Sequence, residues 1–223
     1  MGTTFRITLN EKLYLRDPEQ TELGRKIVKA SIKMIDELGF EHFTFKKLAI
    51  EIDSTEASAY RYFESKHKML IYIISWYWVW LDFQISFQTN NIKSPKERLK
   101  IILRIISQAH LDDINTEIDE AALYRIVVSE SSKAYLTKEV DEANKDGLYR
   151  EYKQLCNNIA EIILEVNPTF RYSHSLVSTV MEASHNQVFF SQHLPSLTDI
   201  KIKDNNYTQL EEYLSHILFS AIS

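Results

Sequence analysis

The sequence has few of the residues that interrupt regular backbone structure. Its 223 residues include only 4 glycines and 4 prolines. A protein made of many short strands needs more of these residues at its turns, so their scarcity favours long helices joined by short loops. Hydrophobic residues make up 44% of the chain and charged residues 26%, the mixture of an ordinary globular protein rather than a disordered one. We therefore predict an all-α fold.

Cysteine and long apolar segments are scarce as well. The single cysteine, Cys156, cannot form a disulfide within one chain, and we expect a buried thiol in a reducing compartment. The apolar run from Met69 to Leu81 is shorter than the roughly 20 residues that cross a bilayer. The first ten residues lack the apolar core of a secretion signal. These features predict a cytoplasmic protein with no membrane partner.

An excess of basic charge is also absent. The net charge is -5 and the pI is about 5.8, whereas DNA-binding domains are usually basic. The charge is uneven, because residues 1–68 hold 12 basic and 11 acidic residues and residues 69–223 hold 14 and 20. A near-neutral first part followed by an acidic remainder is compatible with DNA binding but does not indicate it.

The hydrophobic pattern divides the beginning of the chain into an arm and a helix. Residues 1–20 form the arm, in which apolar and polar residues alternate over a short stretch. From Thr21 the apolar residues recur every three or four positions, as on one face of a helix. Gly39 ends this helix, because glycine adopts the left-handed conformation at a helix end without strain.

Two further short helices are expected directly after the first. Thr44 is suited to cap one of them and Thr55 the other, with a break at residues 53–55 between them. Two short helices separated by three residues, and preceded by an amphipathic helix, are the arrangement of a helix-turn-helix. We predict a helix-turn-helix domain over residues 21–68.

The rest of the chain shows helical periodicity throughout. The third short helix is expected to continue to about Phe63. A polar loop is expected over 195–206. The longer helices are expected at 66–88, from Ser94 onward, and at 116–129, 137–166, 172–193 and 207–222.

Two stretches around the predicted helix-turn-helix are more diagnostic than its spacing. They read FTFKKLA at residues 43–49 and YRYFESKHKML at residues 60–70. This pattern resembles the DNA-binding domain of the TetR family of transcriptional regulators, over roughly residues 22–72. The resemblance implies a homodimeric repressor that binds a double-stranded DNA operator. It also implies an all-helical C-terminal domain, here residues 69–223, which dimerises and binds a small effector that releases the DNA.

The resemblance also implies the residues that contact DNA. Phosphate contacts are expected from Thr44, Lys46, Tyr60 and Lys66, and groove contacts from Thr55, Ala57, Ser58 and Tyr62. Glu56 has two interpretations: it stabilises the start of the third helix, or it accepts a hydrogen bond from a cytosine amino group. The sequence departs from the family at Asp53, where glycine is common. Aspartate takes the left-handed conformation less easily, so the geometry of this turn is a question for the structure.

Aromatic residues crowd the helix that follows the predicted DNA-binding domain. Such a stripe more often belongs to a core than to a pocket, because large aromatic side chains dominate core burial. A pocket for a small apolar or aromatic effector would nevertheless need apolar walls with a few polar groups. The candidates for effector binding are Trp76, Trp80, Phe83, His110, Tyr124 and His185.

The last two helices carry more apolar residues than one packing face requires. We expect them to form the dimer interface. The apolar residues concerned are Leu176, Val180, Ala183 and Val188 in one helix and Leu210, Leu214, Ile217 and Leu218 in the other.

Two other functions stay open from the sequence. The first is a DNA-binding regulator without a small-molecule effector, controlled by a protein partner. The second is a helical-bundle metalloenzyme, because Glu182 and His185 match the Glu-x-x-His motif of di-iron bundles. Such a site needs the motif twice, and it occurs once. We therefore expect no enzymatic activity, no catalytic residues, no metal site and no cofactor.

Overall fold

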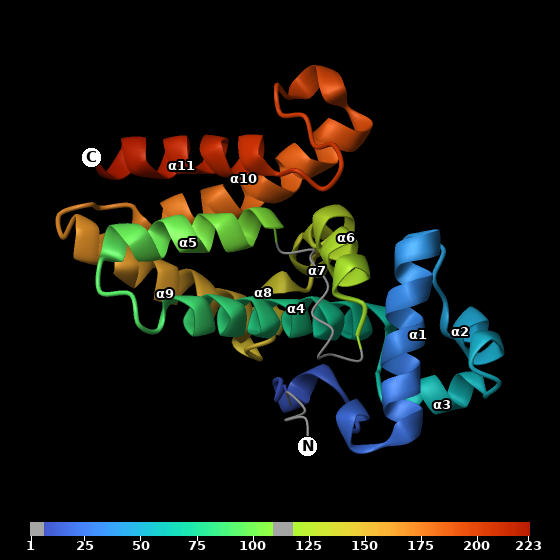
Figure 1. Ribbon diagram of the computed structural model, residues 1–223. Coiled ribbons are helices and arrows are strands. Elements are labelled where there is room, and N and C mark those ends of the chain that lie inside the picture. The colour runs from blue at the N-terminus through green and yellow to red at the C-terminus, as the bar shows by residue number, and fades with distance from the viewer. Residues whose placement is uncertain (1–6, 109–117) are drawn as a thin grey trace. The chain divides into compact units, whose positions relative to one another are not determined.

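The computed structural model describes residues 7–108 and 118–223, and within these ranges the regular elements are helices with no strand (Figure 1). The predicted all-α fold is confirmed. His110, one of the effector-binding candidates, lies outside the described residues. The helices of the first part are the short η1 (Glu11–Leu13) and η2 (Pro18–Gln20), then α1 (Glu22–Leu38), α2 (Phe45–Glu51), α3 (Glu56–Tyr60), α4 (Lys66–Thr89) and α5 (Pro95–Gln108).

The second part of the chain continues in the same way. Its elements are α6 (Glu120–Glu130), α7 (Ser132–Tyr135), α8 (Val140–Lys145), α9 (Arg150–Val166), α10 (Ser173–His193), the short η3 (Pro195–Leu197) and α11 (Thr208–Ile222). The expected loop between α10 and α11 therefore contains one short helical turn. It also contains a single β-bridge between Lys203 and Asn206.

The helices group into two compact units that divide within α4, between Trp78 and Val79. The first unit holds α1 to α3, the beginning of α4, and α6 to α8. The second holds the end of α4, α5, most of α9, α10 and α11. The boundary expected near residue 68 separates the DNA-binding part from the effector-binding part, whereas this division reflects packing alone. The functional boundary therefore stays a prediction.

The first unit is organised around α1. The hydroxyl of Thr21 accepts a hydrogen bond from the backbone N–H of Gly24 at 2.9 Å, which caps the start of the helix. The helix ends at Gly39, whose φ is 76°, as expected from the sequence. The inward face of α1 is buried at every third or fourth residue, and α6 packs against this helix.

One expected helix is two helices in the structure. The prediction of an unbroken helix over residues 137–166 is wrong, because Gly147 takes a φ of 74° between α8 and α9. This positive φ interrupts the helical hydrogen bonds, and glycine adopts it without the steric penalty of a Cβ. The apolar stripe on which the expectation rested begins at Leu148, after the break, whereas α8 has no buried residue. The helix expected from residue 116 is described from Glu120, where Asp119 caps α6.

In the second unit α5, α10 and α11 pack on one another. The inward face of α11 consists of Leu210, Leu214, Leu218 and Ile222, each at most 4% exposed. A hydrogen bond of 2.9 Å from the Asn158 side chain to Asp82 links α9 to the end of α4.

Cys156 is buried, as predicted, and burial raises the pKa of its thiol to about 11, so the protonated form prevails at neutral pH. No helix of the described part of the chain is long and apolar enough to cross a bilayer. No group of three potential metal ligands is found among the same residues.

Candidate nucleic-acid interface

The helices α2 and α3 each bury one side and expose the other. Phe45, Leu48 and Ala49 face inward from α2, and Ala59 faces inward from α3. The two helices pack on each other and follow α1 (Figure 1). The outer surface of α2 holds polar residues together with Ile50, which is 75% exposed.

The turn between α2 and α3 is built around Asp53. Its φ is 51°, so aspartate takes the left-handed conformation for which the TetR pattern often has glycine. Two hydrogen bonds hold the turn: Ser54 donates its N–H to the carbonyl of Ala49 at 2.8 Å, and the ammonium of Lys26 donates to the carbonyl of Ile52 at 2.7 Å. Four residues, 52–55, separate the two helices, one more than expected, and the turn forms without glycine.

Six of the residues expected to contact DNA are exposed on this surface. They are Thr44, Lys46, Thr55, Glu56, Ala57 and Tyr60. Thr44 also caps α2, because its hydroxyl accepts the N–H of Lys47 at 3.2 Å. The ring of Tyr60 is 48% exposed and meets the ring of Phe45 edge to face at 4.8 Å between centroids. Its position is thus fixed by the core, while part of the side chain stays on the surface.

Two residues expected to reach the groove are buried instead. Tyr62 is 3% exposed, and its hydroxyl shares a hydrogen bond of 2.8 Å with the hydroxyl of Thr21. Ser58 is 5% exposed, and its hydroxyl lies 2.9 Å from that of Thr55. The helix α3 ends at Tyr60 rather than near Phe63, so Tyr62 lies beyond it, in the turn that returns to the core. Neither side chain is thus exposed on the outer surface of α2 and α3.

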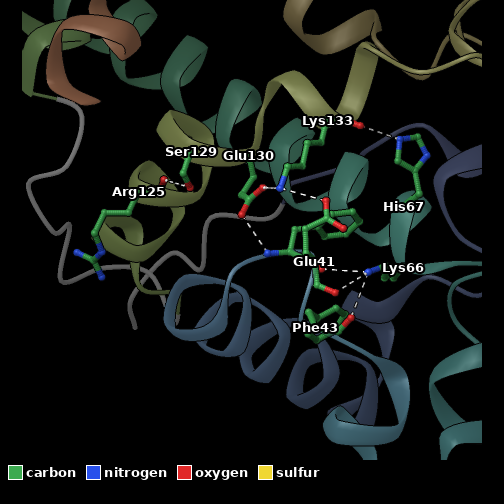
Figure 2. A network of polar contacts seen from close by, with 9 residues as sticks. Glu41, Phe43, Lys66, His67, Arg125, Ser129, Glu130 and Lys133 are labelled. Carbon is green, nitrogen blue, oxygen red and sulfur yellow. Dashed lines mark hydrogen bonds and ion pairs between the residues drawn. The ribbon is translucent and has the colours of Figure 1, made fainter. Parts of the chain in front are cut away.

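Lys66 has a structural role that the sequence did not reveal. Its ammonium donates hydrogen bonds to three backbone carbonyls, those of Phe40 at 3.1 Å, Glu41 at 3.3 Å and Phe43 at 3.4 Å (Figure 2). The ammonium also lies over the ring of Phe40 at 4.6 Å. An ammonium has three N–H donors, and here each has an acceptor within the protein. This arrangement leaves Lys66 without a free donor for a phosphate.

The same close-up shows a buried carboxylate that sequence analysis missed. Glu130, at the end of α6, is 6% exposed and accepts the backbone N–H of Phe40 at 3.0 Å (Figure 2). It also forms an ion pair with Lys133 at 2.7 Å, and Lys133 reaches Glu41 at 3.2 Å. Hydrogen bonding to Glu130 raises the pKa of Lys133. An acidic residue at the end of an apolar helix was the available sequence signal, but its partner lies 90 residues away.

The effector-binding candidates are mostly buried. Trp76, Trp80, Tyr124 and His185 are at most 5% exposed, whereas Phe83 is 43% exposed. Burial lowers the pKa of His185 to about 4, so its imidazole is neutral at physiological pH. Trp76 and Tyr124 belong to the first compact unit, and the other three belong to the second. The role of these residues in effector binding stays a prediction.

Comparison with solved structures shows which fold this is. The fatty acid degradation regulator FadR from Bacillus halodurans superimposes with a TM-score of 0.61 at 16% identity, over 91% of this chain and 96% of that one. FadR from Thermus thermophilus, a TetR-family transcriptional repressor in complex with lauroyl-CoA, matches at a TM-score of 0.56 and 13% identity, over 89% and 94% of the two chains. This protein has the TetR-family fold.

A third structure with this fold includes DNA. AibR, solved with isovaleryl coenzyme A and operator DNA, matches at a TM-score of 0.60 and 14% identity, over 87% of this chain and 97% of that one. No protein-family model and no curated protein sequence matches the chain. At these identities the comparisons establish the TetR-family fold, and function has to be argued from the residues of the site.

Proposed function

We propose that this protein is a DNA-binding transcriptional regulator with no catalytic role, a repressor that a small apolar effector releases from its operator. The observation that supports it best is the outer surface of α2 and α3. There Lys46 and Tyr60 are exposed as phosphate donors, and Thr55 and Ala57 are exposed at the start of α3. Small exposed residues at that end allow a helix to approach base edges in the major groove.

The similar structures support the effector part of the proposal. AibR was solved with an acyl-coenzyme A together with operator DNA, and the Thermus FadR with lauroyl-CoA. Both ligands combine an apolar acyl group with a polar remainder. We therefore propose an effector of apolar character for this protein too, acting in the cytoplasm and binding beyond residue 68. The DNA-binding helix-turn-helix domain would be residues 21–68.

Removing one phosphate-binding side chain should weaken binding to all DNA sequences alike. Lys46→Ala is expected to reduce the slope of log K against log salt by about 0.9, because each phosphate that the protein neutralises releases counterions in that proportion. Lys66→Met is the control variant, because the ammonium of Lys66 already donates to three backbone carbonyls. This variant should have a lower free energy of unfolding and an unchanged salt slope. Titration of labelled operator at several salt concentrations measures both slopes.

The operator itself is obtained by selecting bound duplexes from a random pool. Recovery of no enriched sequence by the wild-type protein would refute the proposal. The same selection with Glu56→Gln decides between the two interpretations of this exposed residue. A change of one preferred base would show base reading, worth about 1–3 kcal/mol of discrimination. An unchanged base preference would show that Glu56 does not read a base and would favour its role in stabilising the start of α3.

We also propose that the protein dimerises through α10 and α11. Of the eight apolar residues first expected at the interface, only Ala183 and Ile217 are half-buried rather than buried. Leu176, Val180, Val188, Leu210, Leu214 and Leu218 are each at most 8% exposed within the single chain. They form the core of the second unit and are not available to a partner. The flank of α11 next to that core carries Ile217, half-buried, and Tyr213, 39% exposed. These two side chains offer an apolar surface to a second copy.

The double variant Tyr213→Asp, Ile217→Asp is therefore expected to be a folded monomer, because it places carboxylates in the proposed interface and leaves the core stripe intact. Light scattering at micromolar concentration should give half the mass of the wild-type protein. Glu212→Ala is the control, since this exposed residue lies about 100° further around the helix. A wild-type protein that is already monomeric would contradict the proposal.

A further inference from the structure

A half-open hollow of about 370 Å³ lies beside α1, within the first compact unit. Its volume is at the lower end of the range for small-molecule sites, which is about 300–1,000 Å³. The hollow has apolar surface from Ala30, Ile52 and Ile118. It shares no lining residue with the predicted DNA-contacting or effector-binding sets, so it is a separate feature of the molecule.

Three lysines of α1 surround the hollow. Lys26, Lys29 and Lys33 are three and four residues apart, which places them on one face of the helix. Lys26 donates to the carbonyl of Ile52 at 2.7 Å and has two further N–H donors. Lys29 is exposed, and within the described residues it has no hydrogen bond or ion pair. Its ammonium is thus available to an incoming anion.

The two carboxylates at the hollow are already engaged. Glu51 pairs with Lys33 at 2.9 Å, and the side chain of Asp119 accepts the N–H of Ala122 at 2.8 Å as the cap of α6. The three lysines nevertheless outnumber the two carboxylates at the hollow, so one ammonium charge is not balanced there. An apolar surface beside an unneutralised ammonium favours a ligand that has both characters, because a purely apolar ligand would desolvate the ammonium without replacing its hydration.

We propose that this hollow binds a small amphiphilic carboxylate, that is, a carboxylate attached to a short hydrocarbon chain or aromatic ring. Lys29 pairs with the carboxylate, and Lys26 provides a second donor. The apolar part of the ligand covers Ala30, Ile52 and Ile118. Such a ligand contacts α1, the end of α2 and the residues before α6 at once. Its binding does not depend on the proposed DNA-binding function.

Decanoate is a suitable probe, used with the full-length protein carrying ¹³C-labelled isoleucine δ1 methyl groups. Titration is expected to shift the methyl signals of Ile52 and Ile118 in a saturable manner, with assignments taken from isoleucine-to-valine variants. Lys29→Glu should weaken binding about tenfold, since it replaces the paired charge by a repulsive one. Ala30→Trp should abolish binding at this position by filling the hollow.

Two controls make the result specific. Lys96→Glu changes an exposed lysine of α5, in the second unit, and should leave decanoate binding unchanged. Decanol has the same chain without the charge and should bind more weakly. The proposal is overturned if decanoate shifts only methyl groups of α5, such as Ile102 and Ile106, or if decanol binds equally well and Lys29→Glu has no effect. Operator selection tests the DNA-binding proposal separately, so the two failures are distinguishable.

Discussion

Replacing Glu130 by alanine is expected to lower the free energy of unfolding by about 2–3 kcal/mol. The carboxylate is 6% exposed and accepts the backbone N–H of Phe40, which is itself buried. Alanine would leave that N–H without an acceptor, and an unsatisfied buried donor costs about 1–3 kcal/mol. The ion pair with Lys133 would be removed as well, although its contribution is small because that lysine is 38% exposed.

Two variants separate the hydrogen bond from the charge. Glu130→Gln keeps an acceptor for the N–H of Phe40 and removes the ion pair, so it should lower stability by about 1 kcal/mol or less. Glu142→Ala removes an exposed carboxylate of α8 and should have almost no effect. Urea denaturation measures all three, provided that the m-values agree. If glutamine is as damaging as alanine, the charge rather than the hydrogen bond stabilises this contact.

The Glu130 contact also shows why part of the structure was inaccessible from the sequence. Local signals, such as the cap Thr44 and the end of α1 at Gly39, depend on residues a few positions apart, and the structure confirms them. The other expected cap, Thr55, precedes α3 but makes no capping hydrogen bond with its side chain. The acceptor role of Glu130 depends on a backbone group 90 residues away. No periodicity or spacing within α6 contains that information.

The same distinction explains the outcome at the candidate interface. The family pattern indicated which residues contact DNA, and Lys46, Ala57 and Tyr60 are among those that are exposed. It could not decide which donors the protein itself uses. Tyr62 is buried against Thr21, and Lys66 is bound to three carbonyls, since the start of α1 and the segment between α1 and α2 present partners to them. Hydrogen-bond satisfaction is a property of the packed chain, and a motif records only residue type.

Gly24 is another residue whose role depends on a contact in the packed chain. Its replacement by alanine should have a large effect on stability. A Cβ at this position would lie 2.3 Å from the carbonyl oxygen and 2.6 Å from the Cα of Pro18, both backbone atoms of η2. Flexible side chains could move aside, but backbone cannot do so without shifting the arm. Gly24→Ala is therefore expected to separate the arm from α1 and to lower stability by about 1–3 kcal/mol, as other overpacked sites do.

Whether Gly24→Ala stabilises or destabilises the protein should depend on the presence of the arm. In a helix without such a neighbour, alanine is more favourable than glycine by about 1 kcal/mol, because it restricts the unfolded chain and suits the helix. In a variant that lacks residues 1–19, the backbone of Pro18 is gone, and Gly24→Ala should then stabilise the protein relative to the truncated parent. Urea unfolding of the full-length and the truncated protein, each with glycine or alanine at position 24, gives the effect of the substitution with and without the arm. A destabilisation of equal size with and without the arm would show that the close approach to Pro18 is not the reason for glycine at this position.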